Sequence, residues 1–222
     1  MSINNATVTS SKEVKLLGLT IDCKLSFSKH ISNICKQAAN KLNAIKRFQK
    51  HISEKTKRQL AKTFVLSYFN FCPLVWHHCG NGDMHNIERM QERVLRFMCN
   101  EYTTDYSELL KIQGESTMYI KRLRLIAQEV YKSISGLNPE YMHSLLTERS
   151  FKSRRPLDIY IPKVNQVTYG YRSYRFQAPT VWNSLPVEIR SSENYPTFKK
   201  LIQTWIGPSC RCTNCLYNSD PI

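Results

Sequence analysis

The sequence predicts a mainly α-helical protein: a helical bundle preceded by a short strand and followed by a small α+β region and a cysteine-rich tail. Three observations lead to this fold class. Apolar residues recur every three or four positions through most of the first 147 residues, which is typical of amphipathic helices. Beyond residue 148 the spacing changes to alternation, which indicates strands. Three cysteines then gather close to the C-terminus.

The first ordered element that we expect is a short buried strand over residues 15–22, after a polar and disordered lead-in over residues 1–13. Leu17 and Leu19 lie two positions apart and would share one face of this strand. Gly18 lies between them, and a glycine inside a strand usually marks a close approach by another backbone or by a ligand.

Three helices are expected next. The first is a basic helix over about residues 26–50, and Ser53 can cap the second because its hydroxyl can accept a hydrogen bond from the first helical turn. Pro73 ends or kinks that second helix. Asp83, at the end of a glycine-rich turn, can cap the third. The apolar stripe of the first helix consists of Phe27, Ile31, Ile34, Ala38, Leu42 and Ile45.

Further helices complete the predicted bundle. A short helix is expected over residues 107–112, and a long one over residues 117–135 carries an apolar stripe at helical spacing. Gly136 suits a left-handed cap at the C-terminal end of the long helix. Another short helix is expected to start at Asn138-Pro139 and to run through Leu145.

The chain is expected to divide into a helical domain over residues 14–147, a basic and aromatic region over residues 148–206, and a tail over residues 207–222. Alternating apolar residues predict a strand near residues 157–161 and a second strand or loop near residues 167–171. Two short helices are expected near the end of this region, over residues 178–185 and 197–205.

Charge and composition narrow the class of partner. The chain has 222 residues, with 32 Lys and Arg against 17 Asp and Glu, a net charge of +15. Such an excess favours a polyanionic partner, because each neutralised phosphate releases counterions. No apolar run approaches the roughly 20 residues that cross a bilayer, so we expect no membrane partner. Eight cysteines without a signal segment are typical of thiols or metal ligands in an intracellular protein.

Several motifs occur in an order that resembles one known family. They are Leu17-Gly18-Leu19-Thr20-Ile21-Asp22, then Cys72-Pro73-Leu74-Val75-Trp76, and finally Trp182-Asn183-Ser184-Leu185-Pro186 followed by Phe198-Lys199-Lys200 and Trp205. From about Val14 onward, the chain resembles the end of the reverse transcriptase domain, an RNA-directed DNA polymerase, in non-LTR (LINE-type) retrotransposons of animals. The resemblance implies a primer grip at Leu17 and Gly18, a thumb-like helical bundle after it, and a location in the nucleus or in a cytoplasmic ribonucleoprotein.

The resemblance begins after the catalytic palm of this family. Reverse transcription needs clustered aspartates that hold two magnesium ions, and the family carries two of them side by side. Asp22 is more typical of a turn or cap residue than of a catalytic acid. We therefore expect that the chain alone is not an enzyme. All of its aspartates are isolated in the sequence: Asp22, Asp83, Asp105, Asp158 and Asp220.

Basic residues around the first helix–helix connection are candidates for binding the phosphates of a template–primer duplex. Such contacts fix position without reading the base sequence. The alternative is an ordinary solvated helix face, but acids are scarce in this stretch. The candidate residues are Lys41, Lys46, Arg47, Lys50, Lys55, Lys57, Arg58 and Lys62.

A second candidate interface lies in the basic and aromatic region. Tyrosine rings can stack on unpaired bases while guanidinium groups meet phosphates, so this mixture suits single-stranded nucleic acid. The alternative is a small pair of strands whose tyrosines only pack. The candidate cations are Arg154, Arg155, Arg172 and Arg175.

The tail offers a possible zinc site. Cys210, Cys212 and Cys215 can supply three thiolates, whereas a structural zinc site takes four ligands. A fourth ligand would have to come from elsewhere in the chain or from a partner. The alternative is a flexible tail with reduced cysteines.

The sequence thus predicts an RNA- and DNA-binding fragment of a retrotransposon polymerase without its own active site, which is either a truncated element copy or works with a separate catalytic part. The alternative is a protein-interaction or zinc-binding module derived from such an element. An exposed apolar patch on the first strand and helix would favour that alternative.

Overall fold

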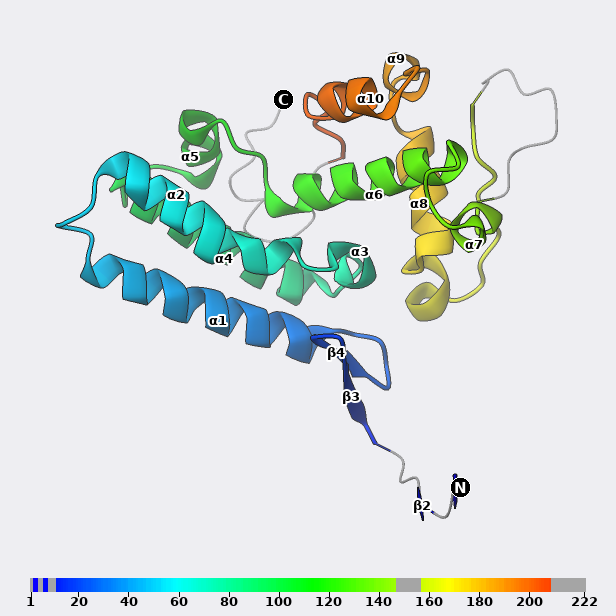
Figure 1. Cartoon of the computed structure of the whole chain (residues 1–222), viewed down its shortest axis with the longest axis horizontal. Helices are drawn as coiled ribbons and strands as arrows, with labels where there is room; N and C mark the ends of the chain where they lie inside the picture. The colour runs from blue at the N-terminus through cyan, green and yellow to red at the C-terminus, as the bar shows by residue number, and fades with distance from the viewer. Residues whose placement is uncertain (1, 4–5, 8–10, 147–156, 209–222) are drawn as a thin grey trace.

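The computed structural model describes residues 2–3, 6–7, 11–146 and 157–208 of the chain (Figure 1). Within these residues the protein is mainly α-helical, as predicted, and its strands form two short antiparallel pairs. The cysteine-rich tail from residue 209 onward lies outside the described residues. In the first pair, β1 (Ser2–Ile3) lies against β2 (Ala6–Thr7).

The predicted single strand is instead a hairpin. Strand β3 (Glu13–Leu16) pairs with β4 (Leu19–Asp22), and Leu17 and Gly18 form the two-residue turn between them. Their φ angles are 46° and 92°, as a tight hairpin turn with positive φ at both positions requires. The prediction of one buried strand is wrong. Apolar residues at every second position continue through the two-residue turn, so the sequence pattern alone does not show where the chain reverses. Leu17 is 87% exposed, and all of β3 is exposed.

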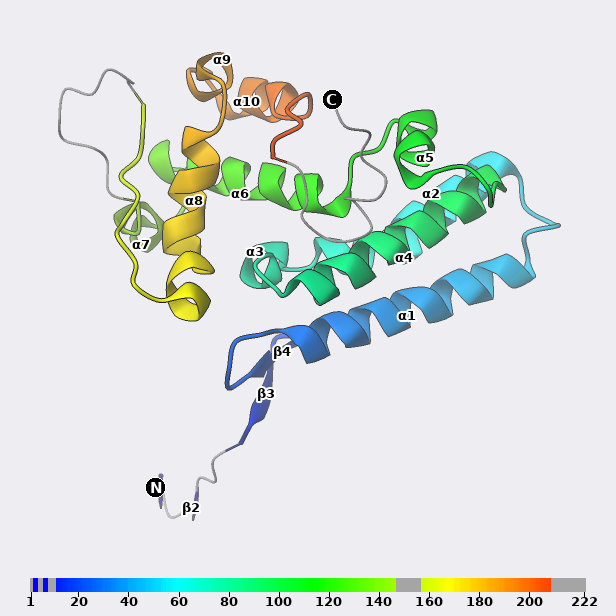
Figure 2. The ribbon, with the colours of Figure 1, turned by 180° about the vertical axis from the view of Figure 1, so that it is seen from behind.

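A layer of helices follows the hairpin in the chain. The predicted basic helix is confirmed as α1 (Ser28–Arg47), which packs against α2 (Glu54–Phe64) and α4 (Asn81–Cys99) (Figures 1 and 2). Ser53 caps α2 as predicted, because its hydroxyl accepts a hydrogen bond from the Thr56 backbone nitrogen at 3.2 Å.

The start of α4 differs from the prediction. Gly80 occupies the N-cap position, so Asp83 lies within the first turn and does not cap the helix. The Asp83 carboxylate accepts a hydrogen bond from the hydroxyl of Ser28 at 2.6 Å. This contact joins the first turns of α1 and α4, so the two helices run side by side from a shared start.

The segment between α2 and α4 is built around Trp76. A 3₁₀ turn, η1 (Leu66–Asn70), leads into the short helix α3 (Pro73–Trp76), whose first residue is the proline. Pro73 therefore begins a new helix, because its missing N–H has no partner to lose at that position. The Trp76 ring is fully buried, and its Nε1 donates to the Phe71 carbonyl oxygen at 3.0 Å.

The remaining helices of the predicted bundle are confirmed as α5 (Tyr106–Gln113), α6 (Met118–Ile134) and α7 (Glu140–Ser144). Thr117 caps α6 through a hydrogen bond from the Ile120 backbone nitrogen. Gly136 follows α6 with φ 67°, the left-handed conformation that its position predicts.

The C-terminal part is helical where a second strand or loop was expected. A π-helical turn, η2 (Val167–Tyr171), occupies the place of the predicted second strand or loop, and α8 (Tyr174–Asn183), α9 (Val187–Arg190) and α10 (Tyr195–Leu201) follow it. Among residues 157–208 no strand element is formed.

The strand prediction fails at residues 167–171 because the tyrosines there alternate without facing a sheet. Tyr169 and Tyr171 are both largely exposed. Gly170 lets this turn approach the preceding segment closely, since a Cβ atom there would lie 2.8 Å from Cβ of Val164.

The tryptophan–asparagine motif near the end of α8 holds an extended segment in place. Nε1 of Trp182 donates to the Leu157 carbonyl oxygen at 2.9 Å. The Asn183 side chain both accepts from the Ile159 backbone nitrogen and donates to its carbonyl oxygen, at 2.9 and 2.8 Å. The amide of Asn183 therefore binds both backbone polar groups of Ile159.

Buried apolar side chains form two cores that meet along α6. The first core runs from Leu19 to Met118 and lies among α1–α5. The second begins at Ile120, close to the start of α6, and continues through α8 and α10 to Trp205. Nε of Arg124, on α6, donates to the Trp205 carbonyl oxygen at 2.9 Å. Helix α6 therefore starts in one core and supplies the central wall of the other.

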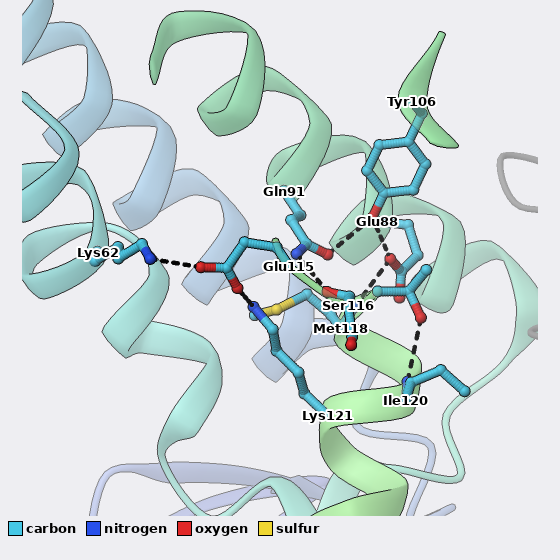
Figure 3. A network of polar contacts seen from close by, with 10 residues as sticks. Lys62, Glu88, Gln91, Tyr106, Glu115, Ser116, Met118, Ile120 and Lys121 are labelled. Carbon is cyan, nitrogen blue, oxygen red and sulfur yellow. Dashed lines mark hydrogen bonds and ion pairs between the residues drawn. The ribbon is translucent and has the colours of Figure 1, made fainter. Parts of the chain in front are cut away.

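A buried carboxylate fixes the start of α6. Glu88, on α4, accepts hydrogen bonds from the backbone nitrogen of Met118 at 3.2 Å and from the Tyr106 hydroxyl at 2.7 Å (Figure 3). It also accepts one from the backbone nitrogen of Tyr119 at 2.7 Å. The Tyr106 hydroxyl also lies 2.8 Å from Oε1 of Gln91. These contacts join α4, α5 and α6. The contact with α6 arises because the first backbone N–H groups of a helix need acceptors from outside the helix.

Replacing Glu88 should destabilise the fold. Glu88→Ala leaves two backbone N–H groups without an acceptor in the interior, and we expect a loss of about 3 kcal/mol in the free energy of unfolding. Urea unfolding followed by circular dichroism measures this loss. Glu92→Ala, at a more exposed position on the same helix, is the control, with an expected change below about 1 kcal/mol. Equal losses in the two variants would contradict the role of Glu88.

Burial raises the pKa of Glu88 above its ordinary value of 4.5, although Arg122 and the three donors oppose the shift. The folded chain therefore holds this proton more tightly than the unfolded chain. Its contribution to stability is complete below pH 4.5 and is lost as the pH rises through the folded pKa. We expect Glu88→Gln to lack this decline, measured as the difference between the pH profiles of the two proteins. Parallel profiles would show that Glu88 does not titrate in this window.

Candidate nucleic-acid interface

The stretch that forms α1 and the connection to α2 carries positive charge only. No acidic residue occurs between Asp22 and Glu54. Basic side chains in this stretch point to several sides of α1, and its apolar stripe faces the first core. The cations of the stretch are Lys24, Lys29, Lys36, Lys41, Lys46, Arg47 and Lys50.

Five of the predicted phosphate-binding residues lie at the surface, and none of them takes part in an ion pair within the described part of the chain. They come from α1, from the connection after it and from the first turns of α2. Their charges are therefore available to a bound polyanion. They are Lys41, Arg47, Lys50, Lys55 and Arg58.

The other three predicted residues serve the fold. The ammonium groups of Lys46 and Lys57 lie 6.0 and 5.3 Å from the centre of the Phe97 ring, and Lys57 is buried. Lys62 pairs with Glu115 at 2.6 Å, and Lys121 pairs with the other oxygen of the same carboxylate (Figure 3). Sequence alone gives neither the direction of a lysine side chain nor its ion-pair partner, so these three residues were indistinguishable from the other five.

A groove of about 300 Å³ lies between α1 and α4, and it was not predicted from the sequence. Arg89 and Arg93 line it from α4, one turn apart, and Ser32 and Asn86 add neutral polar groups. Both arginines are exposed and belong to no ion pair among the described residues. The one signal in the sequence was the four-residue spacing of the arginines, which places them on one side of a helix.

The thiols near this surface are uncharged at neutral pH. Burial and the nearby Asp83 carboxylate raise the pKa of Cys35, which lines the groove, to about 11. Burial is also the main reason why the pKa of Cys79 is raised to about 12. Neither thiol is suited to act as a nucleophile, which requires the thiolate.

Asp22 acts as a turn residue, as predicted. Its carboxylate accepts hydrogen bonds from the backbone nitrogens of Lys24, Ser26 and Phe27 and from the Ser26 hydroxyl, at 2.8 to 3.1 Å. Slight burial opposes these hydrogen bonds, which together lower the pKa of Asp22 below its ordinary value. The carboxylate holds the loop between β4 and α1 and is occupied by protein donors.

Arg172 and Arg175 are exposed at the N-terminal end of α8, and Arg172 lines a cavity together with the exposed Tyr169. This cavity shares no lining residue with the groove between α1 and α4. The predicted site residues Arg154 and Arg155 lie outside the described residues.

The two residues predicted as a primer grip lie at the tip of the hairpin, where Gly18 faces the Phe71 ring and Leu17 projects into solvent. The predicted zinc ligands Cys210, Cys212 and Cys215 lie outside the described residues. Within residues 11–146 and 157–208, no group of three metal-ligating side chains is close enough to hold an ion.

Searches against family models, curated proteins and solved structures find no match to this chain. None of the helices in the described residues is both long enough and apolar enough to span a bilayer. We therefore infer the function from the geometry and charge of the surface just described.

The different roles of neighbouring lysines can be measured. Lys57→Ala removes a buried stem and its contact with the Phe97 ring, so we expect it to lower the free energy of unfolding by about 1 kcal/mol. Lys55→Ala, two residues earlier at the surface, should change it by less than about 0.5 kcal/mol. Urea unfolding of both variants tests the assignment, and a loss that is as large for Lys55 would overturn it.

Proposed function

We propose that this protein is a nucleic-acid-binding clamp for an RNA template and a DNA primer, and that it has no polymerase activity of its own. It would correspond to the thumb-like and C-terminal part of a retrotransposon RNA-directed DNA polymerase. It would then act in a nuclear or cytoplasmic ribonucleoprotein with a separate catalytic part.

The observation that carries this proposal is the set of exposed cations along α1, the start of α2 and the groove beside α4 that form no ion pair with any described residue. Surface lysines and arginines in an ordinary protein are interspersed with acids, which lower the local potential. Here α1 contains no acid, and Arg89 and Arg93 add two guanidinium groups to its edge. The groove lining combines two arginines with Ser32 and Asn86, beside the sulfur-containing side chains of Cys35 and Met90, and contains no acid, which suits a phosphate backbone.

These contacts would position a duplex without reading its sequence. Lysines and arginines that meet phosphates contribute binding that weakens as salt rises, because bound counterions are released into solution. Ser32 and Asn86 can donate further hydrogen bonds to phosphate oxygens. We therefore expect little preference among base sequences at this surface.

A second candidate function, a protein-interaction module, is favoured by the exposed hairpin. Val14, Leu16 and Leu17 are each more than half exposed and lie together on β3 and its turn. Among the described residues, strand β3 pairs only with β4, so its other edge would be the place for a partner strand to add. Such a partner would be a protein, with metal binding by the tail as a separate property.

Salt-dependent binding distinguishes the two candidates. We expect the protein to bind an RNA–DNA hybrid with an affinity that falls steeply across a salt series. The double variant Arg89→Gln/Arg93→Gln should reduce the slope of log affinity against log salt by about two, one for each phosphate that is no longer neutralised. Fluorescence anisotropy with a labelled hybrid measures both quantities.

The matched control is Lys199→Gln/Lys200→Gln, which removes the same charge from exposed positions on α10. This variant should leave the slope unchanged. No binding at low salt, or equal effects of the two double variants, would refute the clamp at this surface, and absence of binding would make the interaction module the leading candidate. Extension of a primer by the purified protein would refute the proposed lack of polymerase activity.

A further inference from the structure

A cavity of about 220 Å³ lies between the N-terminal part of the chain and the entry to α8. Its walls come from the loop between β4 and α1, from α3 and the residues after it, and from the turn that leads into α8. Both overall views show the N-terminal turn of α8 beside α3 and the loop after β4 (Figures 1 and 2). The proposed clamp leaves this cavity unexplained.

Part of the cavity lining suits a flat ring. Phe27, Leu74, Val75 and Tyr169 supply apolar and aromatic surface, and Tyr169 is more than half exposed at the opening. The volume lies below the roughly 300 Å³ at which typical small-molecule sites begin. The cavity therefore has room for one ring system with an open exit, and an aromatic ring at such an opening can stack on a base.

The rest of the cavity lining includes polar and positively charged groups. Arg172 lines it and belongs to no ion pair among the described residues, and the lining contains no acid. His78 also lines it, and Nε2 of His78 has no hydrogen-bond partner within the described protein. Burial, Arg122 and Arg172 lower the pKa of His78 to about 4, so its ring is neutral at pH 7. A neutral imidazole can accept or donate a hydrogen bond at the edge of a base.

The loop that forms one wall is held in an unusual backbone conformation. Leu25 and Phe27 both line the cavity, and their φ angles are 51° and 59°. Non-glycine residues adopt this region at a conformational cost and keep it only where the surroundings impose it. The Asp22 carboxylate imposes it here, through hydrogen bonds to the backbone around both residues. The wall is therefore formed before any ligand arrives.

We propose that this cavity binds one unpaired nucleotide at the end of a nucleic-acid strand held by the clamp. The base would lie between Tyr169 and the apolar wall, with His78 at its edge, and the phosphate would meet Arg172. The proposal rests on the clamp described above, because the strand must first be held for its end to reach the cavity. It adds a contact that the basic surface cannot make, namely recognition of an unpaired base.

The test compares RNA–DNA hybrids that are blunt with hybrids that carry a single-nucleotide overhang at either end of each strand. We expect at least one overhang to strengthen binding by about fivefold or more, the effect of one stacked base. Tyr169→Ala should abolish this gain and leave the affinity for the blunt hybrid unchanged. Arg172→Gln should reduce the gain. Circular dichroism checks that each variant is folded, and both side chains are exposed.

Two controls make the result specific. Tyr160→Ala removes another exposed tyrosine, which does not line the cavity, and should keep the full gain. An overhang that lacks its base should lose most of the gain, because only the phosphate contact with Arg172 remains, whereas a full gain from the abasic overhang would overturn the stacking contact.

The outcomes separate this proposal from the clamp. Equal affinities for blunt and overhanging hybrids, or a gain that survives Tyr169→Ala, would overturn the cavity and leave the clamp intact. Failure to bind any hybrid at low salt would overturn the clamp and the cavity with it.

Discussion

The relative placement of α4, α5 and α6 depends on one buried carboxylate, that of Glu88. Glu88 is surrounded by donors from two other elements: the hydroxyl of Tyr106 on α5 and the first backbone nitrogens of α6. A carboxylate in the interior is tolerated only when its oxygens are hydrogen-bonded, and a helix that starts in the interior needs acceptors for its first N–H groups. Here the Glu88 carboxylate supplies the acceptors and the first N–H groups of α6 supply the donors. The position and direction of α6 are therefore set from α4.

This constraint also relates the basic surface to the cavity. The arginines of the groove and Glu88 belong to the same helix, α4, and α6 carries the second core against which α8 packs. The turn that brings Arg172 and Tyr169 to the cavity is the entry to α8. A surface built from several elements can bind a rigid duplex only if those elements keep their spacing, and packed, hydrogen-bonded helices provide this.

The helices were predictable from sequence because their signals are local. Ser53 and Thr117 cap helices within three residues of the groups that they bind, and the apolar stripes repeat at the helical period. What the sequence could not show depends on residues far apart in the chain. The contact of Glu88 with α6 spans 30 residues, and the inward direction of Lys57 depends on a ring on another helix. The hairpin was missed because Leu17 occupies a turn conformation that favours glycine.

Helix α6 also sets the order in which the chain can fold during synthesis. The contact between Arg124 and Trp205 joins residues 81 positions apart, so the second core cannot close until α10 and the residues up to Trp205 have left the ribosome. The first core has all of its residues by Met118 and can form much earlier. For this interval the nascent chain presents the apolar side of α6 without its final neighbours. Domains that appear first on the ribosome generally fold first, and such transiently uncovered surface is where chaperones bind and aggregation begins.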